Sequence, residues 1–295
     1  MTMLKNVSWT MSNLCNGVPE EHWNQVLEAL PPFSKLVYQQ DEEILKDVCW
    51  TLSYISGGTQ DRIQAVLDLD SRICQRLVEL LGHSSSSVQH AALITVGNIV
   101  TGDDEQTQIL LNHQLLPRLR SLLCHSKSNI LKDACFTLSN IAAGNQTQIQ
   151  ALVDAKIIPA LTMLFDDTLQ SSPSFDVQVE ATWALANALS NGSPSHVEYM
   201  VHQNCIRAIT QPELFCELDI PTIDAVLEAL EHILELGRKK AFELRGNENS
   251  LNPYLKYFES GDVHVLESLT ELLANLQDQE PLARKLSHII QTLLD

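Results

Sequence analysis

Apolar residues recur every three or four positions along most of this chain, and short polar stretches separate the apolar runs. In TQIQALVDAKIIPALTMLF (147–165), Leu and Ile fall at helical spacing, and Pro159 suits the first turn of a second helix. A polar cluster such as SKSN (126–129) then precedes a longer apolar stretch. The pattern predicts a unit made of one short, one medium and one long helix.

The long-helix stretch occurs six times at nearly constant spacing. LITVGNIVTG (93–102) and CFTLSNIAAG (135–144) are close copies, and each carries an Asn near its end. A period of 41 to 47 residues is typical of helical repeats of the armadillo or HEAT kind. One repeat cannot bury its apolar face alone, so we expect an all-α, right-handed superhelical solenoid of armadillo repeats. The six equivalent residues, called anchors below, are Asn13, Tyr54, Asn98, Asn140, Asn187 and His232.

The repeats predict a single solenoid over residues 1–295. We expect 1–17 to be the last helix of a partial repeat and 241–295 to be a C-terminal capping repeat. Between them we expect five repeats, at 18–58, 59–102, 103–144, 145–192 and 193–240.

A Gly follows several of the long helices, at Gly102, Gly144 and Gly192. Helices commonly end in a residue with left-handed backbone geometry, which Gly adopts without strain. We therefore expect these three glycines to be left-handed helix terminators.

An aromatic residue lies four positions before the anchor in four of the long helices, which places both on one helix face. A structural interpretation is that the aromatic residue belongs to the core and the anchor only ends the helix. The recurrence of the whole set favours a binding interpretation. Neighbouring rings would form slots for Lys or Arg stems, carboxylates would pair the charge, and Asn amides would bond an extended peptide backbone. The pairs are Trp9 with Asn13, Trp50 with Tyr54, Phe136 with Asn140 and Trp183 with Asn187, and a polar residue precedes each aromatic by three positions: Asn6, Asp47, Asp133 and Glu180.

The charge balance is compatible with a basic partner. The chain has 37 Asp and Glu against 19 Lys and Arg, a formal net charge of −18. This charge keeps the protein soluble or attracts basic peptides, and it repels nucleic acid and anionic membranes, neither of which we expect as a partner. The seven Cys contain no Cys-x-x-Cys pair, which indicates a reducing compartment. Because metal-ligand spacings, phosphate loops and catalytic motifs are absent from the sequence, we expect no enzyme activity, no metal and no cofactor.

The aromatic–Asn pairs, together with NIVTGDDEQTQ (98–108) and SNIAAGNQTQIQ (139–150), resemble the importin-alpha family of armadillo adaptors over about residues 1–240. The resemblance implies a receptor for the basic nuclear localization signal peptides of cargo proteins, acting in cytoplasm and nucleus. It implies a remnant of the family's major peptide site at Asn6, Trp9, Asn13, Glu43, Asp47, Trp50 and Tyr54. It implies the minor site at Val100, Thr101, Asp104, Thr107, Phe136, Ser139, Asn140, Glu180, Trp183 and Asn187.

The chain departs from the family pattern at several positions. Ile94 stands where the family usually has Arg, Phe136 replaces Trp, and Glu228 with His232 ends the series of pairs. A Lys/Arg-rich stretch does not precede the repeats. We therefore expect the chain as given, whether a fragment or a short form, to lack the importin-beta-binding segment and the first three repeats, and not to bind importin-beta.

The helical pattern continues from about Glu217 to the C-terminal end. By the resemblance, these repeats bind the export receptor of importin-alpha, or they form a simple cap. The alternative to an import receptor is an armadillo scaffold that assembles protein complexes without import activity.

Overall fold

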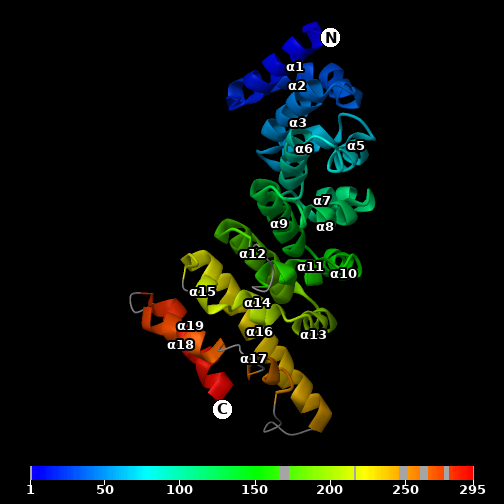
Figure 1. Cartoon of the computed structure of the whole chain (residues 1–295). Coiled ribbons are helices and arrows are strands. Elements are labelled where there is room, and N and C mark those ends of the chain that lie inside the picture. Colours follow the sequence, from blue (N-terminus) through cyan, green and yellow to red (C-terminus); the bar gives the residue numbers. More distant parts are fainter. Residues whose placement is uncertain are drawn as a thin grey trace. The chain divides into compact units, whose positions relative to one another are not determined.

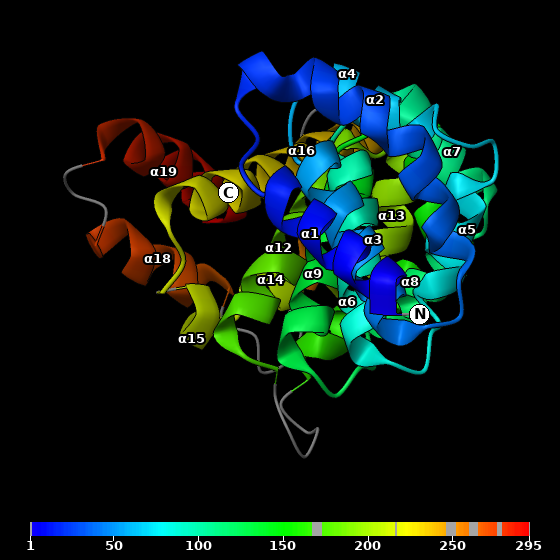
Figure 2. The same cartoon turned by 90° about the horizontal axis from the view of Figure 1, so that it is seen from above.

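The computed structural model describes residues 2–166, 173–215, 217–245, 252–259, 265–275 and 279–294. Over these ranges the secondary structure is helix, and none of the described residues lies in a strand. The chain divides into two compact units, Met1–Ile141 and Ala142–Asp295, which are described separately below. Figures 1 and 2 show their helices from two directions.

The first unit consists of long helices that alternate with shorter ones. Its elements are α1 (Thr2–Cys15), η1 (Glu20–His22), α2 (Trp23–Ser34), η2 (Lys35–Tyr38), α3 (Glu42–Ser56), α4 (Gln60–Leu67), α5 (Ile73–Leu80), α6 (Ser86–Ile99), α7 (Asp104–Asn112), α8 (Leu115–Leu122) and α9 (Ser128–Ala142), whose last residue opens the second unit.

The long helices of the first unit pack against one another in chain order. Helix α3 contacts α1 on one side and α6 on the other, and the three lie in sequence in Figure 1. Val48 and Leu52 of α3 and Val96 of α6 are fully buried between them. Thr95 Oγ1 donates to the Cys49 carbonyl (2.9 Å), so the buried hydroxyl is satisfied across the helix pair. The shorter helices α4, α5, α7 and α8 contact each other and form a second layer.

The second unit has the same alternation. Its elements are α10 (Gln146–Asp154), α11 (Ile157–Thr162), η3 (Met163–Phe165), α12 (Phe175–Asn191), α13 (Pro194–His202), α14 (Cys205–Ile209), α15 (Pro212–Phe215), α16 (Ile220–Arg245), α17 (Lys256–Glu259), α18 (Val265–Asn275) and α19 (Glu280–Leu294). Here α16 contacts α12 and α19, while α10 contacts α13 and α11 contacts α14.

Gly102, Gly144 and Gly192 are not left-handed, so that prediction is wrong. Gly17 is the one glycine with positive φ among the described residues, and Gly192 has φ −71°. These positions are glycine because space is short: a Cβ on Gly102 would lie 2.1 Å from Gln106 Oε1, and one on Gly192 would lie 2.7 Å from the Ala188 carbonyl oxygen. The left-handed residues are instead Gln114, Lys156 and Asn204, each directly before a short helix.

The crowding at Gly102 comes from the capping of the following helix, whereas at Gly192 the nearest atom belongs to the preceding helix. Helices α7, α10 and α13 each begin with a capping box, in which the N-cap side chain and the side chain three residues later bond each other's backbone N–H. The second member is Gln106, Gln148 or His196. His196 Nδ1 accepts from the Ser193 N–H (3.2 Å), so Nε2 carries the proton and donates to Gln150 Oε1 (2.8 Å). Burial lowers the pKa of His196.

Helix α16 runs through residue 240, where one expected repeat boundary lies, and Gly237 is inside it. The buried Asn252 explains this glycine. Its Nδ2 donates to the Leu234 carbonyl (2.9 Å), and its Oδ1 accepts from the Tyr254 N–H (2.9 Å). A Cβ on Gly237 would lie 1.9 Å from Asn252 Oδ1. The repeat boundaries, including the capping repeat 241–295 that lies partly outside the described residues, stay predictions.

The described cysteines are free thiols, and all but Cys124 are buried. Burial raises the pKa of Cys49 to about 12 and that of Cys74 to about 11. Cys216 lies outside the described residues.

Across the described ranges, no single helix is long and apolar enough to cross a membrane. One pair, Gln146–Asp154 with Ile157–Phe165, reaches that length and composition only when both are taken together across a 70° bend.

Candidate peptide-binding surfaces

Helix α1 carries the first aromatic–Asn pair on an exposed face. Trp9 is 62% exposed, and Asn6 and Asn13 are exposed on the same helix. Asn13 Nδ2 donates to the carbonyl of Trp9 (2.7 Å). This bond uses one of the two amide protons and fixes the carboxamide beside the indole ring.

Helix α3 carries the second pair, Trp50 and Tyr54. Their rings stack with centroids 5.9 Å apart and an interplanar angle of 24°. Both side chains are half-buried, so together they form one continuous aromatic surface. The structure thus brings these two predicted residues together.

The acidic residues predicted near this pair are already engaged by the chain itself. Asp47 is 7% exposed, accepts a bond from Ser8 Oγ (3.4 Å) and lies 3.4 Å from Lys46 Nζ. Glu43 is exposed and pairs with Lys5 Nζ at 2.7 Å. The hydrogen bond to Glu43 is the largest cause of the raised pKa of Lys5. Asp47 therefore lies at the helix interface rather than on an open surface.

Four predicted residues lie between the end of α6 and the first turns of α7; two are buried and two are exposed. Val100 and Thr107 are the buried ones, and Thr107 Oγ1 donates to the Val100 carbonyl (3.4 Å), a bond that stabilises the turn. Thr101 and Asp104 are exposed. Of this group, these two can offer a side chain to a ligand.

Helix α9 repeats the arrangement of α1. Phe136 is 38% exposed, and Asn140 Nδ2 donates to the Phe136 carbonyl (2.9 Å). The buried Ser139 donates its hydroxyl to the same carbonyl (2.8 Å). A Cβ on Gly97 would lie 3.8 Å from Phe136 Cδ1, which shows how closely the phenyl ring approaches the α6 backbone.

In the second unit, α12 carries Glu180, Trp183 and Asn187, all half-buried. Trp183 Nε1 donates to Thr222 Oγ1 (3.0 Å) at the start of α16, and Thr222 in turn donates to Asp219. Thr222 therefore fixes the indole orientation. Thr222 is not part of the sequence pattern, because it lies in the next repeat and has no counterpart among the aromatic pairs.

Two anchors stabilise the stacking of repeats instead of facing outward. Asn98 Nδ2 donates to the Ser53 carbonyl (2.9 Å), which belongs to the preceding long helix. His232 Nδ1 lies 2.8 Å from the Leu189 carbonyl in the same way. Glu228, the partner of His232 in the series, lies 3.6 Å from Lys285 Nζ of α19. The last position of the series, Glu228 with His232, therefore forms contacts within the chain.

The comparisons with known proteins agree with this architecture. The Armadillo/beta-catenin-like repeat family matches residues 20–57, 103–143 and 145–190. Importin subunit alpha-1a of Oryza sativa subsp. japonica is 53% identical over 113 residues, which are 38% of this chain and 21% of the relative. Importin subunit alpha-8 of Arabidopsis thaliana is 35% identical over 277 residues, which are 94% of this chain and 60% of the relative.

The chain is an importin-alpha-like armadillo-repeat protein. It spans less than two thirds of the length of these relatives.

Solved structures confirm the fold of this importin-alpha-like chain. A designed armadillo repeat protein in complex with the peptide (KR)4 has a TM-score of 0.71 at 24% identity, over 90% of this chain and 99% of the designed one. A computationally designed armadillo repeat protein for modular peptide recognition has a TM-score of 0.68 at 27% identity, over 79% of this chain and 94% of its own length. The prediction of an all-α armadillo solenoid is therefore confirmed.

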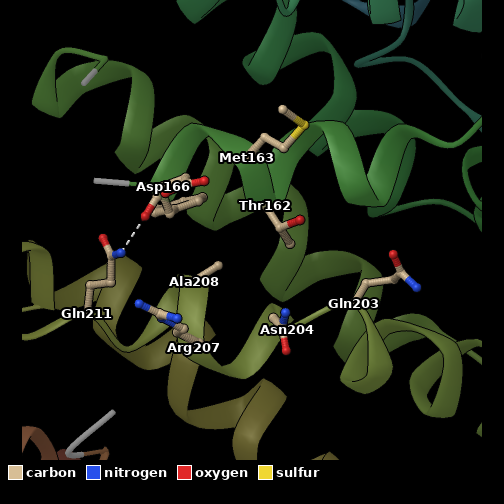
Figure 3. A pocket seen from close by; sticks show the side chains of 9 residues that line it. Thr162, Met163, Asp166, Gln203, Asn204, Arg207, Ala208 and Gln211 are labelled. Carbon is tan, nitrogen blue, oxygen red and sulfur yellow. Dashed lines mark hydrogen bonds between the residues drawn. The ribbon is translucent and has the colours of Figure 1, made fainter. Parts of the chain in front are cut away.

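The second unit also contains a cavity of about 280 Å³ away from the predicted pairs. Figure 3 shows its walls, formed by α11 and η3 on one side and by α14 with its flanking residues on the other. Gln211 Nε2 donates to the Phe165 carbonyl (2.5 Å) at one end. The lining combines polar and apolar side chains and includes neither Trp183 nor Asn187: Thr162, Met163, Phe165, Asp166, Gln203, Asn204, Arg207, Ala208 and Gln211.

Within the part of the chain that the structure describes, groups of three or more His, Cys, Asp or Glu placed to hold a metal ion do not occur.

Proposed function

We propose that this chain is a receptor for extended, Lys/Arg-rich peptides and that it serves as a nuclear import adaptor, moving between cytoplasm and nucleus. The two relatives reported above, both named importin subunit alpha, support the adaptor role. The designed protein of the same fold that was solved with (KR)4 supports the peptide chemistry.

The observation that carries the proposal is an arrangement that occurs twice in the first unit. On α1 and again on α9, an exposed aromatic ring stands beside an Asn whose amide donates to the ring residue's own carbonyl. The bond holds the carboxamide in place before any ligand arrives, which lowers the entropy lost on binding. The amide oxygen and the second amide proton suit the N–H and C=O groups of an extended peptide.

Each pair supplies two kinds of contact. The ring faces attract the cation of a Lys or Arg side chain and pack against its aliphatic stem. The Asn bonds the peptide backbone, whatever the peptide sequence. The net charge of −18 raises the rate at which basic peptides arrive.

We assign the binding residues separately in each unit. Buried Val100, Thr107, Ser139 and Asp47 are supporting residues in this assignment, because their side chains are covered. The second unit would contribute Glu180, Trp183 and Asn187. In the first unit, the residues proposed to contact peptide are Asn6, Trp9, Asn13, Glu43, Trp50, Tyr54, Thr101, Asp104, Phe136 and Asn140.

The C-terminal helices from α16 onward are proposed to serve a different partner, the export receptor of importin-alpha. The support is that Glu228 and His232 form internal contacts, which leaves this region without an aromatic–Asn pair.

The test is peptide binding by paired alanine variants. Fluorescence anisotropy with labelled (KR)4 should show affinity losses of about 2 kcal/mol or more for Trp9→Ala with Asn13→Ala, and for Trp183→Ala with Asn187→Ala. Alanine at Ile109 and Met163, which are exposed and belong to no pair, gives a matched control. Wild-type affinity in both paired variants would refute the proposal.

The scaffold alternative is favoured by one observation, the half-buried Ile94 at an aromatic position of the series. A scaffold would hold its partners equally well when the paired residues are replaced. Import of a cargo carrying a Lys/Arg-rich segment into nuclei of permeabilised cells, with and without this chain, separates the two functions.

A further inference from the structure

We propose that His90 is a specificity-determining residue that fills, from within the chain, a cation slot between Trp50 and Asp133. The inference rests on the proposed function and concerns how the first unit selects among basic peptides. Its consequence is that a Lys or Arg of the peptide is excluded at this one place on the surface.

The slot has the two components that a cation-binding position needs. Trp50 on α3 supplies an aromatic wall, and Asp133 on α9 supplies a carboxylate. His90 on α6 lies between them: its ring is perpendicular to the Trp50 ring at a centroid distance of 5.6 Å, and its Nε2 is 2.7 Å from Asp133 Oδ2. The side chains of His90 and Asp133 are 24% and 22% exposed, so the hydrogen-bonded pair is close to the surface but covered on most sides.

A third contact fixes the imidazole in this place. Asn129 Nδ2 lies 3.4 Å from both ring nitrogens of His90. The ring is therefore held by residues of α3 and α9 at once, and it cannot move aside without losing the Asp133 bond. A peptide cation would have to displace a side chain that is already bound in the slot. This competition reduces the binding free energy available to the peptide there.

The residue one turn further along α6 does not provide another binding position for a cation. Ile94, one turn after His90, is apolar and half-buried. Between the aromatic pair of α3 and that of α9, helix α6 therefore presents to the peptide a slot already filled by His90 and an apolar residue, Ile94. The accepted peptide residue opposite His90 is a small or apolar one.

Removing His90 should open the slot. His90→Ala leaves Asp133 and Trp50 facing an empty position, and the affinity for labelled (KR)4 should rise about five-fold. His90→Gln keeps an N–H donor for Asp133 and most of the volume, and should bind (KR)4 like wild type. Asp133→Asn combined with His90→Ala removes the charge that the peptide would use, so the gain should disappear. His22→Ala, at an exposed histidine of η1, is the matched control and should leave affinity unchanged.

These outcomes separate the inference from the proposed function. If wild type binds (KR)4 and folded His90→Ala binds it equally or more weakly, His90 does not fill a cation slot. If the gain persists with Asp133→Asn, the effect comes from loosened packing, and the inference is again refuted. If wild type itself does not bind (KR)4, the proposed function fails, and this inference fails with it.

Discussion

Gly237→Ala should destabilise the second unit even though it improves the helix in which it occurs. In an exposed helix interior, Ala is favoured over Gly by about 1 kcal/mol. Here the new Cβ would lie 1.9 Å from Asn252 Oδ1 and 2.5 Å from Cγ. Asn252 is buried and bonded at both ends of its carboxamide, so it has no alternative place to go without losing those bonds.

The size of the effect follows from what Asn252 holds. Each of its two hydrogen bonds contributes about 1 kcal/mol, and their loss outweighs the gain in helix propensity by about 1 kcal/mol. Tyr254 and Phe258, each 4% exposed, belong to the segment that Asn252 fixes. If the segment detaches, the loss of buried apolar area adds about 1.5–3 kcal/mol for each such side chain. We expect Gly237→Ala to lower the unfolding free energy by about 1 kcal/mol while the segment stays in place, and by about 4 kcal/mol or more if it detaches.

The assay is a double-mutant cycle with Asn252→Gly, read by urea unfolding and by hydrogen exchange at residues 252–258. Gly237→Ala should accelerate exchange in that segment. In the Asn252→Gly background the clash is absent, and the same substitution should instead stabilise by about 0.5–1 kcal/mol. Stabilisation in both backgrounds would contradict this expectation, because it would show that Asn252 can move away from the new Cβ without a loss of stability.

Three further predictions concern single residues. Phe136→Trp should tighten binding of (KR)4 about two- to five-fold, because indole is the better cation–π partner; unchanged affinity in a titration would count against the ring's role. His196→Gln should match wild type in unfolding free energy at about pH 7.5 and exceed it at about pH 5.5, because burial depresses the folded-state pKa below the ordinary 6.5 and stability is lost as pH falls through that range; parallel stability–pH curves would contradict this. Among the described thiols, Cys124 should react first with N-ethylmaleimide in mass spectrometry, because burial raises the pKa of Cys49 to about 12 and keeps it a thiol; earlier labelling of Cys49 would be the opposite result.

The repeat architecture could be predicted because it depends on the spacing of apolar residues within each helix and on the distance between repeats along the chain. Each long helix carries apolar residues at helical spacing, and the period alone implies stacking. The aromatic–Asn pairs could also be located, since residues four apart share a helix face. Their positions depend only on geometry within one helix.

Contacts between repeats could not be predicted in the same way. Gly102 suggested a left-handed helix end, and the structure shows a glycine that makes room for Gln106. Gly237 lies inside α16 and faces Asn252, a contact for which the sequence gives no local signal. His90 and Thr222 gave no signal, because each acts on a residue 39 to 43 positions away. A single sequence does not show which side chains of neighbouring repeats meet.

Binding of basic extended peptides through charge and ring contacts, on the surfaces that carry the aromatic–Asn pairs, is tested most directly by the dissociation constant of labelled (KR)4. We would measure it over increasing salt, beside a matched peptide in which every Lys and Arg is Gln. We expect saturable binding of (KR)4 that weakens steadily with salt, and no measurable binding of the Gln peptide. Equal affinity for the two peptides, or (KR)4 binding that salt does not change, would contradict it.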